Sequence, residues 1–236
     1  NVIDNMAQVI VDSMTYDEIC DLFRQDANLI SHRIEEGKKK YKPLLKNSRS
    51  KERTYFAPMR FTSSRGFSYV LQFYNKGIEY PTKDRLGWFY YAWFRKDRGI
   101  YALSYTRMRS LYGHEFWHFN MYHPHFFDRY RERFLKDLTL SKPEVIHKYV
   151  LNNLKSSDVC VPSQKYPNAE WKMCNDGLCL CNLIHGLDTE AKTFITWDMA
   201  GIDQKDIAKK GKELISQLGF EVRIPDDNFD EFTKDE

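Results

Sequence analysis

The fold is decided by the stretch Trp88-Phe-Tyr-Tyr-Ala-Trp-Phe94, in which all residues but one are aromatic. The run from Phe67 to Phe73 before it places a large apolar side chain at every second position. Aromatic residues and a period of two are typical of β-strands. Asn75-Lys-Gly77 and Asp97-Arg-Gly99 supply turns between such runs. The sequence from Tyr55 to Tyr122 is therefore predicted to form an antiparallel meander.

Helical periodicity is found before this region. In the first 36 residues, apolar side chains recur three or four positions apart, which predicts two helices. Thr15-Tyr-Asp-Glu18 has the residues of a capping box in front of the second helix, and Gly37 is expected to end that helix. Lys38 to Arg53 has no sustained apolar periodicity, so it is predicted to be an exposed and mobile linker.

Further elements are expected after the meander. Proline is favoured in the first turn of a helix, so Pro124 is expected to begin a helix that runs to about Asp137. A short helix should follow Ser141-Lys-Pro-Glu144, and strands are expected at Gly177 to Ile184 and Thr193 to Trp197. The buried stripe of the helix that starts at Pro124 is expected to consist of Phe127, Tyr130, Phe134 and Leu138.

These elements predict an α+β fold, with an antiparallel, aromatic-rich sheet packed against helices and an N-terminal helical segment. We assign residues 1–36 to the N-terminal helical segment and 37–53 to a basic linker. Residues 54–225 are assigned to an α+β core domain, which is expected to close with a helix from Asp203 and a strand at 220–224. Residues 226–236 form an acidic tail.

Composition excludes several classes of protein. The 236 residues are 42% hydrophobic and 15% aromatic, which is ample for a core and excludes global disorder. No apolar run approaches the length of a membrane helix, and the first residues do not have the pattern of a signal segment. Five cysteines, an odd number in a chain of this length, predict a reducing cytoplasm rather than a disulfide framework.

Charge is distributed unevenly along the chain, although the net charge is only +3. Ten basic residues lie between Lys38 and Arg65 against Glu52 as the one acid, a local balance of +9. Such a run predicts contacts with a polyanion, and a solvated surface is the alternative. The candidate nucleic-acid-binding residues are Lys38, Lys39, Lys40, Lys42, Lys46, Arg49, Lys51 and Arg53.

The sequence His114-Glu-Phe-Trp-His118 matches the zinc-binding motif HExxH. On a helix, His114 and His118 would share one face and ligate zinc, with Glu115 as the general base. The surrounding residues favour a strand, in which this geometry is lost. We therefore expect no cofactor, and a zinc ion bound by this motif is the alternative.

The richest polar segment is His123 to Arg133. On a helix, His125, Arg129 and Arg133 fall at i, i+4 and i+8 and form one stripe, where a bound phosphate would relieve the repulsion between the arginines. Neutralisation of the arginines by Asp128 and Glu132 on a solvated face is the competing interpretation.

This helix, followed by strands that end in Thr193-Phe-Ile-Thr-Trp197, resembles compact metal-independent ribonucleases of the RelE and barnase-like toxin group. The resemblance covers residues 120 to 200. It implies metal-independent cleavage of RNA at His125, Arg129 and Arg133.

A third cluster contains Cys174, Cys179 and Cys181, followed by His185. With Cys160 or Cys174, the cysteines of the late strand could ligate zinc, but the chain has no paired C-x-x-C motif. Ordinary core thiols are the simpler interpretation.

The leading expectation from the sequence is a nucleic-acid-facing protein, with RNA as partner and ribonuclease as the activity. The linker would contact phosphates, His118 or His125 would act as general acid or base, and the arginines would stabilise the developing charge. A zinc hydrolase or peptidase and a non-catalytic binding or regulatory module are the alternatives, and the sequence specifies no oligomeric state.

Overall fold

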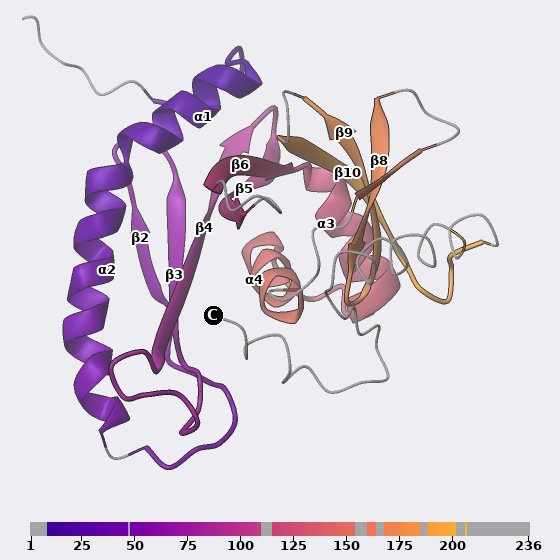
Figure 1. Ribbon diagram of the computed structural model, residues 1–236. Coiled ribbons are helices and arrows are strands. Elements are labelled where there is room, and N and C mark those ends of the chain that lie inside the picture. Colours follow the sequence, from indigo (N-terminus) through magenta and orange to yellow (C-terminus); the bar gives the residue numbers. More distant parts are fainter. Residues whose placement is uncertain are drawn as a thin grey trace, which may run out of the picture. The chain divides into compact units, whose positions relative to one another are not determined.

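The computed structural model describes residues 9–46, 48–109, 115–153, 160–163, 168–184, 188–201 and 206. The fold is α+β, as predicted, with helices and a mostly antiparallel arrangement of strands (Figure 1). Aromatic side chains pack in clusters in both parts of the chain. The chain forms two compact units, Asn1–Ser104 and Tyr105–Glu236, a different division from the predicted segments. The closing helix and strand expected after Asp203, and the acidic tail, lie outside the described residues.

The N-terminal unit joins two consecutive helices to an antiparallel sheet. Its helical elements are α1 (Tyr16–Gln25), α2 (Ala27–Tyr41) and the 3₁₀ turn η1 (Lys42–Leu45). Its strands are β1 (Thr54–Tyr55), β2 (Met59–Thr62), β3 (Ser68–Asn75), β4 (Leu86–Lys96) and β5 (Gly99–Arg109), which continues into the next unit. Strands β1 and β2 both pair with β3, which pairs with β4, and β4 pairs with β5. The predicted meander is thus confirmed over these strands.

Local sequence explains where the elements of this unit begin and turn. The predicted capping box is present, and it begins α1, where the Thr15 backbone N–H donates to the Glu18 carboxylate over 2.7 Å. The predicted second helix is divided at Asp26 into α1 and α2, and most of the predicted first helix lies outside the described residues. Strands β4 and β5 are joined by Asp97 and Arg98, both with positive φ (50° and 61°), as the twist of a two-residue hairpin requires.

Gly37 does not end the second helix, contrary to the prediction. Helix α2 continues to Tyr41, and Gly37 is buried inside it. A Cβ at this position would lie 2.0 Å from the Phe73 ring. The glycine therefore permits close contact between helix and sheet, and the missing side chain is a packing feature rather than a stop signal.

The core of the N-terminal unit lies between the helices and one face of the sheet. The ring of Phe23 on α1 packs 5.5 Å from Phe67 and 5.6 Å from Tyr69, and Tyr41 at the end of α2 packs 5.2 Å from Phe73. All five side chains are buried. The two helices lie along this sheet in Figure 1.

The C-terminal unit contains the remaining described elements. Its helices are α3 (Pro124–Tyr130), the π-helical turn η2 (Arg131–Leu135) and α4 (Lys142–Asn152). Its strands are β6 (Glu115–Tyr122), β7 (Cys160–Pro162), β8 (Ala169–Cys174), β9 (Gly177–Leu183) and β10 (Thr189–Thr196). The strand order is β6-β10-β9-β8-β7, with β6 and β10 parallel and the other pairs antiparallel. The expected late strands are confirmed as β9 and β10, the second beginning earlier than predicted.

Aromatic side chains of α3 form the core of this unit. Phe127 and Tyr130 are fully buried, as predicted, and so is Phe126. The Tyr130 ring packs 5.0 Å from Tyr149 of α4 and 5.0 Å from Phe194 of β10. These contacts fix α3 against the sheet.

The predicted stripe is wrong for Phe134 and Leu138, which are 36% and 68% exposed. The helix widens to a π turn after Tyr130 and ends where Lys136 adopts a left-handed conformation (φ 52°). A period of 3.6 residues no longer applies there, so positions four apart do not continue the buried face.

Replacement of Phe134 by Ala is therefore expected to lower the free energy of unfolding by only about 1 kcal/mol. The side chain is partly exposed, and its one described ring contact is a stack on Tyr130 at 5.2 Å, a type of pair worth about 0.5–1.5 kcal/mol. Denaturant unfolding would measure the change, with Phe127→Ala as the buried comparison. An equal loss in the two variants would contradict this exposed assignment.

No helix in the described part of the chain is both long and apolar enough to cross a membrane.

Candidate functional site

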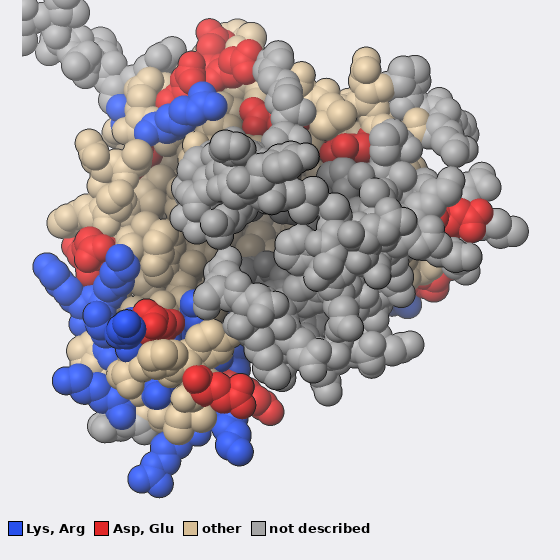
Figure 2. Space-filling model, in the orientation of Figure 1, with Lys and Arg blue, Asp and Glu red and all other residues tan. Residues whose placement is uncertain are grey.

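The predicted basic linker, Lys38 to Arg53, is here called the basic segment. Its first three lysines belong to the last turn of α2, and Lys42 begins η1. Lys39, Lys40, Lys42, Lys46, Arg49 and Lys51 are exposed, and Lys38 and Arg53 are half-buried. In Figure 2, Lys and Arg gather where the C-terminal end of α2 lies in Figure 1, with a few acidic residues among them.

The basic segment is mostly exposed, as predicted, but its first part is not a linker, because residues 38–45 belong to α2 and η1. Tyr41 and Leu45 are buried within it. Arg85 donates to the carbonyl oxygens of Leu45 (3.3 Å) and Ser48 (3.4 Å), and the Ile78 N–H donates to the Ser50 carbonyl over 2.8 Å. The sequence does not predict the burial of Tyr41 and Leu45, because isolated apolar residues in a charged run produce no periodic signal. Asn47 lies outside the described residues.

Some cations of the basic segment have local partners. Lys38 forms an ion pair with Glu35 at 2.7 Å. The Lys40 ammonium lies 5.0 Å from the Tyr41 ring centre, and the Arg53 guanidinium lies 4.6 Å from that of Tyr74. Lysines in the last turn of a helix also interact favourably with its dipole. The lysines at the end of α2 thus contribute to the stability of this helix, whether or not they bind a partner.

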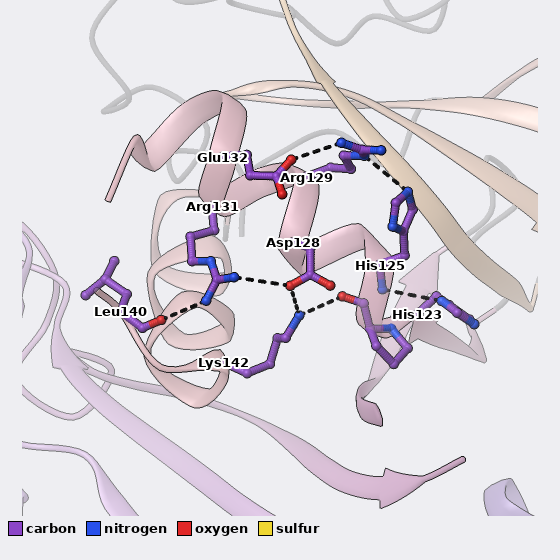
Figure 3. Close-up of polar contacts among 9 residues, drawn as sticks. His123, His125, Asp128, Arg129, Arg131, Glu132, Leu140 and Lys142 are labelled. Atoms are coloured by element: carbon purple, nitrogen blue, oxygen red, sulfur yellow. Dashed lines mark hydrogen bonds and ion pairs between the residues drawn. The ribbon is translucent and has the colours of Figure 1, made fainter. Parts of the chain in front are cut away.

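The His/Arg segment starts at the amino end of α3, in the C-terminal unit (Figure 3). The His123 ring caps this helix by accepting from the His125 backbone N–H over 3.4 Å. Arg129 Nε donates to His125 Nε2 over 3.2 Å, and Arg129 Nη1 pairs with Glu132 at 2.9 Å. Two members of the predicted stripe therefore lie together, and the exposed His125 ring is one of them.

Arg133, the third member, is directed elsewhere. Its guanidinium donates to the backbone carbonyl of Phe194 on β10. Burial lowers the pKa of Arg133, the Arg129 charge lowers it further, and Glu132 acts in the opposite sense. The π turn has displaced this residue from the spacing of an α-helix. Arg133 thus ties η2 to the sheet.

Neutralisation by acidic neighbours is observed in part. Glu132 pairs with Arg129, whereas Asp128 accepts from Lys142 and lies 3.5 Å from Arg131 (Figure 3). Lys142 also donates to the Pro124 carbonyl over 3.0 Å, so this lysine joins the start of α4 to Pro124 and Asp128 of α3.

The other predicted catalytic residue, His118, belongs to a buried polar cluster on strands. Its Nε2 lies 3.0 Å from Asn120 Nδ2. The side-chain oxygen Oδ1 of Asn120 accepts from Lys172 Nζ at 3.0 Å and from Thr189 Oγ1 at 2.8 Å. All four residues are buried. The described contacts of His118 lead to this cluster and not to His125.

Sequence reasoning missed Asn120, Lys172 and Thr189. They come from β6, β8 and β10, so only the strand order brings them to one place. The alternation of His118 with Asn120 on one strand was a usable signal. Nothing in the sequence indicates that Lys172 is buried, because lysines are almost always exposed.

The zinc motif lacks the required backbone. Glu115 to His118 lies in strand β6, and His114 lies outside the described residues. Positions four apart are separated by about 13 Å along a strand and by about 6 Å along a helix. The strand expected from the flanking residues is confirmed for Glu115 to His118, and the helical geometry of a zinc peptidase is absent there.

The cysteine cluster is part of the core. Cys174 Sγ lies 3.8 Å from Cys179 Sγ, and the Tyr149 hydroxyl lies 3.5 Å from Cys179 Sγ. Burial raises the pKa of the Cys174 thiol, which disfavours the thiolate that binds metals. Among the described residues no group of His, Cys, Asp and Glu could hold a metal ion; His185 and the Cys160 side chain lie outside them.

Comparison of the chain with models of known protein families gave no match, and neither did comparison with curated proteins or with solved structures.

Proposed function

We propose that this protein binds nucleic acid through the basic segment. The observation that carries the proposal is that six exposed cations, Lys39, Lys40, Lys42, Lys46, Arg49 and Lys51, project from a folded and anchored stretch in which Glu52 is the one acid.

Anchoring matters for the energetics. Cations on a mobile arm lose conformational freedom when they bind, whereas cations whose backbone is fixed by Tyr41, Leu45 and Arg85 have less to lose. Neutralisation of phosphates by such cations releases condensed counterions. The interaction with a polyanion should therefore be strong at low salt and weaken steeply as salt is added.

Replacement of Lys39, Lys42 and Lys46 by Gln tests this proposal. We expect the full chain to bind an oligouridylate at low salt, with a linear dependence of log affinity on log salt concentration. Each lost contact removes roughly 0.7 from the slope for a single strand, so the triple variant should have a slope shallower by about 2. Fluorescence anisotropy across a salt series measures this slope.

The matched control replaces Arg95, Lys136 and Lys148, three exposed cations outside the basic segment, by Gln. It removes the same charge, so a general effect of net charge would weaken binding equally in the two variants. That result, or an absence of binding by the unmodified chain at low salt, would disprove the proposal.

Ribonuclease activity is a second candidate, which we propose on one observation. The exposed His125 ring lies within hydrogen-bond distance of Arg129, so a proton-transfer group and a phosphate-binding group share one surface. Of the original set, Arg133 is engaged with the Phe194 carbonyl and His118 lies in the buried polar cluster. The candidate active centre is thereby reduced to His125 and Arg129.

The zinc-hydrolase alternative has no comparable support, because the strand at Glu115 to His118 does not provide the helical motif. A non-catalytic binding module needs the basic segment alone, so binding without cleavage would favour it.

A further inference from the structure

An aromatic ladder crosses the N-terminal sheet directly beside the basic segment. It consists of Tyr55 on β1, Tyr74 on β3 and Phe89 on β4. The ring centres of Tyr55 and Tyr74 are 5.8 Å apart, and those of Tyr74 and Phe89 are 6.2 Å apart. Tyr55, the outermost rung, is 43% exposed, whereas Tyr74 and Phe89 are half-buried.

Two features of the backbone hold the ladder in this form. Tyr55 and Tyr74 are directly paired across β1 and β3, so their side chains lie on the same face. Tyr74 is paired with Gly87 on β4, where a Cβ would lie 2.3 Å from the tyrosine ring. The glycine thus makes room for the Tyr74 ring to extend over the neighbouring strand.

The ladder meets the basic segment at Arg53. This residue immediately precedes β1, and its guanidinium lies 4.6 Å from the centre of the Tyr74 ring. Lys51 is exposed two residues earlier. The last cations of the basic segment, Lys51 and Arg53, therefore lie next to the aromatic ladder.

From this juxtaposition we infer that the partner is a single-stranded nucleic acid, with an unpaired base stacked on Tyr55 and the adjacent phosphates on Lys51 and Arg53. The inference rests on the proposed function and adds the class of nucleic acid. Cations alone would suit a duplex or an acidic peptide equally well, but an exposed aromatic face is complementary to a base that is free to leave the stack. A duplex keeps its bases paired and offers no such face.

Single-stranded and duplex RNA of the same length and sequence, compared at one salt concentration, provide the first measurement. We expect at least about fivefold tighter binding of the single strand, since stacking of one base contributes a factor of about 5 to 150. Tyr55→Leu should lose a factor in the same range for the single strand, while Tyr55→Phe should retain nearly all of the affinity.

The salt slope separates this contribution from that of the lysines. Tyr55→Leu changes no charge, so its slope should equal that of the unmodified chain while the affinity drops. Phe134→Leu is the matched control, because Phe134 is a partly exposed aromatic residue in the C-terminal unit, and it should bind normally.

The outcomes distinguish the inference from the proposed function. Equal affinity for single strand and duplex, or normal binding by Tyr55→Leu, would overturn the inference and leave nucleic-acid binding intact. Tighter binding of polyglutamate than of RNA, or binding of neither RNA form, would overturn both.

Discussion

Replacement of Asp26 by Ala is expected to lower the free energy of unfolding of the N-terminal unit by about 3 kcal/mol. This is the lower end of the cost of removing one partner from a buried ion pair, because the Arg65 side chain is 24% exposed and water can solvate part of its charge. The Asp26 side chain is 1% exposed and lies at the break between α1 and α2. Its carboxylate accepts from Arg65 Nη1 at 2.8 Å and from the Tyr69 hydroxyl at 2.9 Å. The variant would leave a buried hydroxyl without its acceptor and a guanidinium without its counter-charge.

The protonation state of Tyr69 strengthens this expectation. Burial raises the pKa of Tyr69, and the negative charge of Asp26 raises it further. The hydroxyl therefore remains a donor throughout the neutral range, and its hydrogen bond is lost as a whole in the variant. A double variant, Asp26→Ala with Tyr69→Phe, should recover part of the loss, because it also removes the unsatisfied hydroxyl.

Denaturant unfolding, with hydrogen exchange of α2 and β3 amides to report on this unit, measures the effect. Asp21→Ala is the control, since Asp21 forms an exposed ion pair with Arg24 at 2.6 Å and such pairs contribute at most about 1 kcal/mol. Equal destabilisation by the two substitutions would show that the buried position of Asp26 carries no special energy.

The Asp26 interaction also illustrates which parts of the fold sequence reasoning predicted. The capping box, the aromatic strands and the buried face of α3 were predicted because they depend on neighbours a few positions apart. The ion pair between Asp26 and Arg65 joins residues 39 positions apart. In the sequence Arg65 belongs to the basic run, and only the folded chain shows that its charge is paired with that of Asp26.

The candidate site divides in a similar way. The basic segment and the contact between His125 and Arg129 follow from composition and helical spacing, which are local properties. The departure of Arg133 required the π turn, for which the sequence carries no marker, and the anchoring of the basic segment required Arg85 from a distant loop. Prediction was thus limited by interactions that cross between elements.

If the protein cleaves RNA, His125→Ala should lower the cleavage rate by about 10²–10⁴-fold, which is the usual contribution of a general acid or base. Binding should remain nearly unchanged, because proton transfer contributes chiefly in the transition state. The arginine should keep its position in this variant, since its ion pair with Glu132 at 2.9 Å does not involve the histidine. Arg129→Ala, by contrast, should reduce both binding and cleavage.

Single-turnover cleavage of a labelled RNA under chelating conditions measures these rates. His32→Ala is the matched control, because His32 is an exposed helical histidine whose ring pairs with Glu36 at 3.3 Å, as His125 contacts Arg129. Its substitution should leave the rate unchanged.

Cleavage that depends on added zinc and is lost in Glu115→Gln would assign the activity to the HExxH motif instead. Cleavage that survives in His125→Ala would remove this residue from the active centre, whereas RNA binding without cleavage in any variant would leave the basic segment as the functional site.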